Sequence, residues 1–329
     1  MSTNEEKKYF DPNVATTILF GQKTLNIFGK LHYLKIVIDA YLKIIPFYRK
    51  ALKDKECYYG PFKGEFGHLL LHTVPFLMHL HKKGVKIHFC SSEIGKPFLL
   101  DDKGNSIIHK FYPLRDFYGE VLPANNQTIL PHDVQAEVDK FDAIAKASKK
   151  AYIDISNTQM YWFVFRNWQL KGKQHLYNLR EVYKTKEERS CVIFPRKKKS
   201  TEYVNNGGPW DYMEIARLVS PYFSKVYMTG HPNMSAELAP EGNIEICVSA
   251  DNSVALEKCS NASLIITQHS GAVHMGAYTN TKVLLIFNGE LPIGGLADTL
   301  RFRQNLSKEP ISYAFSMKDI SDFIKNKLL

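Results

Sequence analysis

The stretch from Ser263 to Gly289, SLIITQHSGAVHMGAYTNTKVLLIFNG, constrains the fold of this chain more than any other. Its two continuous apolar runs, 264–266 and 283–287, are typical of strands that are buried on both faces of a parallel sheet. Between them, the turn at Gln268–Gly271 breaks the first strand, and Ala272–Tyr278 has room for about two helical turns. The stretch therefore predicts a strand, a tight turn, a short helix and a second strand.

The turn between these strands carries groups that suit an anion. A helix that begins after Ser270 and Gly271 presents backbone N–H groups and the positive end of its dipole, and such an end binds phosphate readily. Gly271 has no Cβ, Ser270 offers a hydroxyl, and His274 lies one turn further along the same side. The alternative is a plain strand–helix–strand unit with a serine cap and a buried histidine, and the spacing alone does not separate the two.

Length and charge set the wider limits. The chain has 329 residues, enough for two domains of ordinary size. Its net charge of +10 and pI near 9.1 favour anionic partners such as nucleic acid, nucleotide diphosphates or acidic lipid surfaces, without choosing among them. The five cysteines are scattered and form no CxxC pair, so the sequence suggests neither a zinc site nor a disulfide framework, and a reducing compartment fits best.

The N-terminal part, residues 1–55, predicts a helical extension. Its first ten residues, MSTNEEKKYF, have no apolar signal-peptide core, and no apolar run in the chain approaches a membrane span, so we expect a cytoplasmic location. Apolar residues recur at helical spacing from Leu31 to Ile45, and Pro46 is expected to end or kink the helix. Basic residues line its other faces. This pattern fits either an amphipathic element on an acidic membrane or a packing helix with a solvated basic face, and we prefer the second.

The rest of the chain alternates strands and helices, which predicts an α/β fold. In the first half, a strand at 57–62, a glycine-rich turn, a helix at 68–81 and a strand at 85–90 form a βαβ unit. In the second half the same alternation resumes, with further strands at 191–195, 225–229 and 244–249. The expected domains are the extension 1–55, Rossmann-like α/β/α domains at 56–185 and 186–315, and a closing helix at 316–329.

Three groups that suit an anion follow strands of the second half. They are the basic run Arg196–Lys199, the turn Gly230-His231 and the helix start at Ser270-Gly271. Together they could hold a nucleotide diphosphate without a metal. The chain has no Asp-x-Asp pair, no GxxxxGK[ST] and no proper GxGxxG, which argues against metal-held sugar nucleotides, P-loop kinases and nicotinamide enzymes.

The segment IITQHSGAVHMGAYTNTKVLLIFNG resembles the D-[ST]-G-x-x-H-x-A segment of the heptosyltransferase-like enzymes, glycosyltransferase family 9. In the same order, KGEFGHLLLHTVPFLMHL resembles the family's first turn, FPRKKKS…GGPWDYMEIARLV its strand, lysine and Trp-Pro region, and VYMTGHPN its strand–glycine turn. The likeness covers roughly residues 57–290. It implies a GT-B fold, in which the parallel sheets of two Rossmann-like domains face a central cleft. Other GT-B enzymes, including fucosyltransferases with a basic motif after a strand, remain alternatives to this family.

The resemblance also implies roles for individual residues. The donor-binding residues it implies are Arg196, Lys197, Lys198, Gly230, His231, His269, Ser270, Gly271, Ala272 and His274. Glu65 falls where the family has an acidic residue near the acceptor, so its carboxylate could take the proton from an attacking hydroxyl, and one such displacement inverts the anomeric centre. Gly64, Gly67 and His68 fall on the acceptor side.

Two departures from the family pattern stand out. His269 occupies the position of the family's aspartate, and Glu65 is one methylene longer than aspartate. The pair His68 and His72 has the i, i+4 spacing of metal ligands, but without a third ligand in view helix packing is the simpler interpretation. We therefore expect no metal and no bound cofactor.

The resemblance thus predicts an inverting, metal-independent glycosyltransferase with a nucleotide-diphosphate-sugar donor. The expected acceptor is a hydroxyl of a glycan, glycolipid or glycoprotein, with peripheral contact to an acidic membrane as a further partner and no nucleic acid. Two alternatives stay open: a non-catalytic basic protein that binds nucleic acid or acidic membranes, and a GT-B sugar-nucleotide epimerase.

Overall fold

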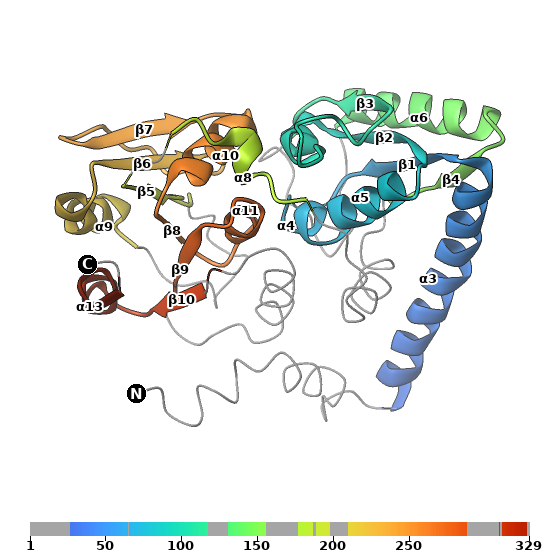
Figure 1. The fold of residues 1–329 in the computed structure, drawn as a ribbon. Helices are drawn as coiled ribbons and strands as arrows, with labels where there is room; N and C mark the ends of the chain where they lie inside the picture. Colours follow the sequence, from blue (N-terminus) through green and yellow to red (C-terminus); the bar gives the residue numbers. More distant parts are fainter. Residues whose placement is uncertain are drawn as a thin grey trace. The chain divides into compact units, whose positions relative to one another are not determined.

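The computed structural model describes residues 27–64, 66–117, 131–155, 177–186, 189–197, 210–287, 309 and 311–327. The chain divides into two compact units. Unit 1 comprises Met1–Asp101 and Asn105–Tyr177, and unit 2 comprises Asp102–Gly104 and Asn178–Leu329. Each unit has its own parallel sheet with helices against it (Figure 1).

The sheet of unit 1 has four described strands in the order β3-β2-β1-β4, and all its pairings are parallel. Their bounds are β1 Glu56–Phe62, β2 Lys86–Ser92, β3 Lys110–Leu114 and β4 Ala151–Ile153. In register, Cys57 of β1 pairs with Ile87 on one side and with Ala151 on the other. The predicted βαβ unit is confirmed, because β1 and β2 pair in parallel and helical segments connect them.

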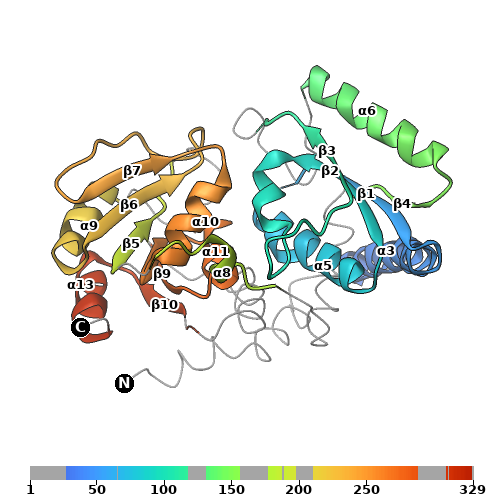
Figure 2. The ribbon, with the colours of Figure 1, turned by 45° about the horizontal axis from the view of Figure 1, so that its top comes forward.

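Helices cover both faces of this sheet. The helical segments are α3 Ile27–Asp54, α4 Phe66–His68, a π-helix Leu69–Thr73, α5 Val74–Lys82, a 3-10 helix Glu93–Phe98 and α6 His132–Ala147. Figure 2 shows α6 on one face and α5 on the other, with α3 beside β4. Gly84 ends α5 with a positive φ of 72°, which glycine adopts without a steric penalty.

Helix α3 runs through Pro46 and ends only at Asp54. The sequence predicts that Pro46 ends or kinks the helix, and an end at this position is wrong. The packing of the last turns explains the difference, since Ile44, Phe47 and Ala51 are buried while Pro46 is exposed. Burial of the apolar residues offsets the hydrogen bond that proline cannot donate. The end of the predicted N-terminal extension is thus part of the core of unit 1.

The sheet of unit 2 has six described strands in the order β10-β9-β8-β5-β6-β7, again all parallel. Their bounds are β5 Ser190–Ile193, β6 Lys225–Gly230, β7 Ile244–Val248, β8 Leu264–Thr267, β9 Lys282–Ile286 and β10 Ile311–Ala314. The strand–turn–helix–strand prediction for Ser263–Gly289 is confirmed over the residues that the structure describes, up to Phe287.

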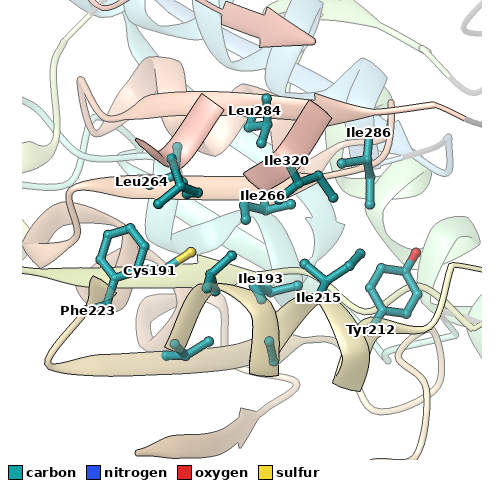
Figure 3. Close-up of a cluster of buried hydrophobic side chains, with 14 of the residues drawn as sticks. Cys191, Ile193, Tyr212, Ile215, Phe223, Leu264, Ile266, Leu284, Ile286 and Ile320 are labelled. Atoms are coloured by element: carbon teal, nitrogen blue, oxygen red, sulfur yellow. The ribbon is translucent and has the colours of Figure 1, made fainter. Parts of the chain in front are cut away.

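The helices of unit 2 also form two layers. They are α8 Arg180–Tyr183, α9 Tyr212–Val219, a 3-10 helix Ser220–Tyr222, α10 Asn252–Asn261, α11 Ala272–Tyr278 and α13 Met317–Lys327. Helices α9 and α13 cover one face, and α8, α10 and α11 cover the other (Figure 2). Ile215 of α9 and Ile320 of α13 pack with Ile193 and Ile266 in the first of these layers, a cluster shown in Figure 3.

Helix α8 belongs to unit 2 because of the contacts around it. The Leu179 N–H donates to the Tyr278 carbonyl at 2.8 Å, and the N–H groups of Thr185 and Lys186 donate to Asn261 Oδ1 at 3.0 and 3.1 Å. Division at Asn178 keeps these bonds inside one unit, whereas the sequence analysis places the boundary between 185 and 186.

Both sheets reverse their strand order at the first strand of the unit. In unit 1, β2 and β3 lie on one side of β1 and β4 lies on the other. In unit 2, β6 and β7 lie on one side of β5, and β8 begins the other side. Open α/β sheets bind ligands outside the carboxyl ends of the strands at such a reversal. The ends of β1 and β4 and the ends of β5 and β8 are therefore the places to look for a site.

Candidate functional site

In unit 2, two predicted donor-binding segments leave the sheet side by side at the reversal. Arg196 and Lys197 follow β5, and Ser270 and Gly271 follow β8. The strands pair up to Ile193 and Ile266, and the Phe194 N–H then donates to the Ile266 carbonyl at 3.1 Å. This bond extends the pairing to the start of both segments.

The loop after β6 is tied to the same basic run. Arg196 forms an isolated antiparallel bridge with Ser235, and the Lys197 N–H donates to the Met234 carbonyl at 2.7 Å. On the other side of Arg196, the Pro195 carbonyl accepts from the Ala236 N–H, also at 2.7 Å. The structure therefore brings the first two residues of the basic run together with the loop that begins at Gly230 and His231.

Gly230 and His231 shape this loop. Gly230 has a φ of 150°, and a Cβ there would lie 2.4 Å from Ser235 Oγ, so only glycine fits. His231 is buried, and its Nδ1 accepts a hydrogen bond from the Asn233 N–H at 3.2 Å. This bond leaves the proton of the neutral ring on Nε2. Gly230 thus has a structural role in the described loop, whatever its role toward a donor.

The start of α11 differs in detail from the predicted row of unpaired N–H groups. Ser270 Oγ accepts from the Ala272 N–H at 3.3 Å, and the carbonyls of Ser270 and Gly271 accept from the N–H groups of Val273 and His274 at 3.2 and 3.1 Å. These amides are satisfied within the turn. The N–H groups of Ser270 and Gly271 themselves have no hydrogen-bond acceptor among the described residues, and both residues are half-buried. The groups of the turn that could bind an anion are therefore the N–H groups of Ser270 and Gly271 and the Ser270 hydroxyl.

Helix α11 is enclosed on all sides. Every residue from Ala272 to Tyr278 is buried, and His274 is only 5% exposed. Gly271 has an ordinary helical φ of −53°, so its conformation does not require glycine. His269 lies before the turn and is half-buried. The turn residues are thus the more accessible part of this segment, and the assigned role of His274 stays a prediction.

Lys197 at this edge has one weak ion pair. Lys197 Nζ lies 3.8 Å from a carboxylate oxygen of Glu237, and both side chains are at least half exposed, so the pair is weak. Burial raises the pKa of Tyr212 to about 12, while the backbone and the charge of Arg196 act in the opposite direction. Tyr212 therefore stays protonated beside Arg196 at neutral pH. Lys198 lies outside the described residues.

In unit 1, the corresponding edge is the glycine-rich turn after β1. Gly64 follows the strand, Gly67 and His68 lie in the short helix α4, and all three are half-buried. Glu65, the predicted catalytic residue, lies outside the described residues. The helix widens into a π-helix directly afterwards, an irregularity that is frequent at functional sites.

The histidine pair of this helix does not form a metal site in the described part of the chain. The rings of His68 and His72 are 5.8 Å apart, and His72 is buried. No group of three or more His, Cys, Asp or Glu side chains suited to a metal occurs among the described residues. Metal independence stays a prediction.

Asp154 is a candidate that the sequence analysis did not single out. It directly follows Ile153, the last residue of β4, which pairs with Tyr59 of β1. Its side chain is exposed at the reversal point of the unit 1 sheet. The sequence alone does not mark Asp154, because its place at this edge depends on where β4 ends.

The cysteines offer no nucleophile. All five are free, and Cys57, Cys90, Cys191 and Cys259 are buried. Burial raises the pKa of Cys57 and Cys90 to about 12, and it also raises those of Cys191 and Cys259. The thiolate form, which is the reactive one, is therefore scarce at neutral pH.

A scan of the sequence against protein-family models gave no match, and a search of curated proteins gave none either. Solved structures do match. The E. coli heptosyltransferase WaaC with ADP-2-deoxy-2-fluoro heptose has a TM-score of 0.53 at 11% identity, over 82% of this chain and 99% of that chain. WaaC with ADP has a TM-score of 0.53 at 12% identity, over 83% and 98%. A glycosyl transferase family 9 protein from Veillonella parvula has a TM-score of 0.49 at 11% identity, over 82% and 89%.

At such low identity the likeness to WaaC establishes the fold rather than the reaction. The predicted resemblance to the heptosyltransferase-like family is confirmed at this level. The chain has the α/β GT-B fold of these heptosyltransferases.

Proposed function

We propose that this protein is a glycosyltransferase that moves a sugar from a nucleotide-diphosphate donor to a hydroxyl acceptor. The observation that carries the proposal is the edge of the unit 2 sheet at β5 and β8. There, a basic run and a serine–glycine turn with two available amides lie at the strand reversal of a GT-B fold. The matched WaaC structures hold ADP and an ADP-linked fluoro-heptose, which are ligands of the proposed class.

In this proposal the donor pyrophosphate binds at the edge of unit 2. The N–H groups of Ser270 and Gly271 and the Ser270 hydroxyl donate to phosphate oxygens, while Arg196 and Lys197 balance their charge. Ala272 and His269 flank the turn, and Lys198, His231 and His274 complete the proposed donor set. Cationic side chains at a diphosphate do the work of a metal ion, so we propose transfer without one.

The transfer step is a single displacement. The acceptor oxygen forms a bond to the anomeric carbon as the bond from that carbon to the β-phosphate oxygen breaks. Glu65 takes the acceptor proton, and the electron pair leaves with the nucleoside diphosphate, whose charge the basic run stabilises. Attack from the side opposite the leaving group inverts the anomeric centre. Gly64, Gly67 and His68 border the acceptor in this scheme.

The acceptor we propose is a hydroxyl of a glycan, glycolipid or glycoprotein. We propose that the enzyme itself acts in the cytoplasm. None of the described helices combines the length and apolar character that a bilayer crossing requires. Contact with an acidic membrane does not depend on donor binding, and the exposed face of helix α3 is the part of the protein that concerns it.

Nucleoside diphosphates should raise the melting temperature of the protein, because a ligand that binds only the native state stabilises it. The test is a thermal-shift panel of ADP, GDP, UDP and CDP without added metal. Arg196→Gln should remove most of the shift. Arg217→Gln is the matched control, because Arg217 lies in the last turn of α9 and pairs with Glu241, which precedes β7 at the opposite edge of the sheet. The proposal fails if no diphosphate shifts the wild type, or if both variants lose the shift equally.

Glu65→Gln separates binding from transfer. It should keep the thermal shift with the effective diphosphate and lose transfer of sugar from the matching sugar nucleotide, typically by a factor of about 10²–10⁴ for a lost general base. Retained transfer would exclude Glu65 as the base and direct attention to Asp154. The same product assay without acceptor recognises an epimerase, which converts the donor alone.

A further inference from the structure

Helix α3 has a packed face and an exposed apolar face. Ile44, Phe47 and Ala51 are buried in unit 1, where the helix meets β1 and β4. Ile38 and Leu42, four residues apart, and Ile45, three further on, share the other side of the helix. Ile38 is 48% exposed, Leu42 68% and Ile45 40%.

This exposed face is unusual for the protein. Three of the five large hydrophobic residues that are exposed in the described part of the chain lie on it. Figure 1 shows that the N-terminal part of α3 extends beyond the sheet of unit 1. Packing of α3 against unit 1 uses the opposite side and does not explain an apolar stripe in water.

Cations continue the same face. Arg49 lies one turn after Ile45 and Lys53 one turn after Arg49, and both are exposed. Positions 38, 42, 45, 49 and 53 include no acidic residue. The nearby carboxylate of Asp54 pairs with Lys50 Nζ at 2.6 Å instead. The face is thus apolar over two turns and then cationic over two turns.

We propose that this face of α3 docks the protein on an acidic lipid surface. Ile38, Leu42 and Ile45 would enter the boundary between headgroups and acyl chains, and Arg49 and Lys53 would pair with anionic headgroups. A second copy of the chain fits the charges less well, because it offers no acidic residue on this face to meet the two cations. The net charge of +10 acts in the same direction by attracting the whole protein to an anionic surface.

The test is flotation of the full chain with vesicles of phosphatidylcholine alone or with one third phosphatidylserine, at low and high salt. The wild type should float with the acidic vesicles, and less so at high salt. The triple variant Ile38→Ser, Leu42→Ser, Ile45→Ser should bind at least about tenfold more weakly. Neutralisation by Arg49→Gln and Lys53→Gln should weaken binding about fivefold per cation.

Helix α6 supplies the matched control. Ile144 is 43% exposed there, and Lys140 is exposed one turn before it. Ile144→Ser with Lys140→Gln removes similar groups elsewhere in unit 1 and should leave flotation unchanged. All variants change exposed side chains, so an unchanged melting temperature verifies their folding.

The proposal is overturned if the wild type does not bind acidic vesicles, or if the α6 control loses binding as the α3 variants do. It is also overturned if the wild type is a dimer in solution that the triple variant converts to a monomer, because a second copy then occupies the face. Flotation needs neither donor nor acceptor. Failure here therefore leaves the thermal shift with nucleoside diphosphates unaffected, and failure of that shift leaves flotation unaffected.

Discussion

The two sheets of the protein keep their charged groups in different places. In unit 2, both faces of the central strands are apolar, and the candidate ligand groups stand only at the carboxyl edge, after β5, β6 and β8. In unit 1, ionisable side chains also lie within the layer between the sheet and α6, near the amino ends of β1 and β2. Unit 2 thus has an apolar sheet with a polar edge, which we call an apolar platform, whereas unit 1 also packs ionisable side chains against its sheet.

The ionisable cluster of unit 1 centres on His88. Its Nε2 lies 2.9 Å from Glu56 Oε1, and its ring stacks on Tyr58 with centroids 4.3 Å apart. Lys150 Nζ lies 3.5 Å from the other oxygen of Glu56, and the His109 ring lies 5.3 Å from the His88 ring. Burial lowers the pKa of His88 more than the nearby carboxylate raises it. His88 is therefore mostly neutral at pH 7.

The largest expected effect is a truncation in the apolar core of unit 2. Ile266 is fully buried in β8, in contact with the cluster that α9 and α13 cover. Ile266→Ala should lower the free energy of unfolding by about 2–5 kcal/mol, because it removes buried apolar surface and leaves a cavity. Denaturant titration measures it, with Leu42→Ala in the exposed face of α3 as the control. A loss no greater than that of the control would refute the description of unit 2 as an apolar platform.

Asn261 is one of the buried polar residues of unit 2, and its truncation should have the next largest effect. Its Oδ1 accepts from the N–H groups of Thr185 and Lys186, and its Nδ2 donates to Thr185 Oγ1 at 3.1 Å. Asn261→Ala should cost about 1–3 kcal/mol, since two backbone amides lose their acceptor. Asn261→Asp keeps the acceptor and should cost less. Equal losses in the two variants would show that packing, rather than the two amides, gives Asn261 its importance.

A pH titration should distinguish the two units. Because the folded-state pKa of His88 lies below its ordinary value of 6.5, the unfolded chain binds more protons, and stability is full above pH 6.5 and falls as the pH drops below it. His88→Phe, which keeps a ring to stack on Tyr58, should flatten the decline in melting temperature between pH 7 and 5. The lowered pKa of Glu56 acts below its ordinary value of 4.5 and so outside this window.

The control for the pH experiment is Ile266→Val in the apolar interior of unit 2, which changes packing but no ionisable group. It should leave the slope between pH 7 and 5 close to that of the wild type. If it flattens the slope as much as His88→Phe does, the interior of unit 1 is not the source of the pH response.

The sequence predicts most strands of this fold because central parallel strands are continuous apolar runs, as in β5, β6, β8 and β9. It misses β10, Ile311–Ala314, an edge strand in which three of the four residues are half-buried and no clear pattern appears. Near β3 the apolar pair Ile107 and Ile108 is buried ahead of the strand rather than within it. Apolar runs identify burial, and strand bounds follow from pairing that the sequence does not display.

The candidate site, like the strands, is predicted from the sequence only in part. Topology alone predicts that residues after β5 and β8 meet, because parallel strands share their carboxyl edge. It does not predict that the Ser270 side chain and the carbonyls of the turn use up the next amides, because this depends on the φ and ψ angles of the turn. Asp154 was missed for a related reason, since its significance depends on where β4 stops.

The smallest effect is expected for a surface ion pair of unit 2. Arg217 Nε lies 3.2 and 3.0 Å from the two oxygens of Glu241, and Nη2 lies 2.8 Å from Oε2. The guanidinium lowers the pKa of Glu241, so the pair contributes above the ordinary carboxylate pKa and loses its effect in acid. Both side chains are more than half exposed, at 56% and 52%, so water and salt screen the attraction despite good geometry. A double-mutant cycle with Arg217→Gln and Glu241→Gln should therefore give a coupling smaller than any loss above, and 1 M salt should abolish it. A coupling that persists at high salt would mean that this ion pair stabilises the surface of unit 2 despite its exposure.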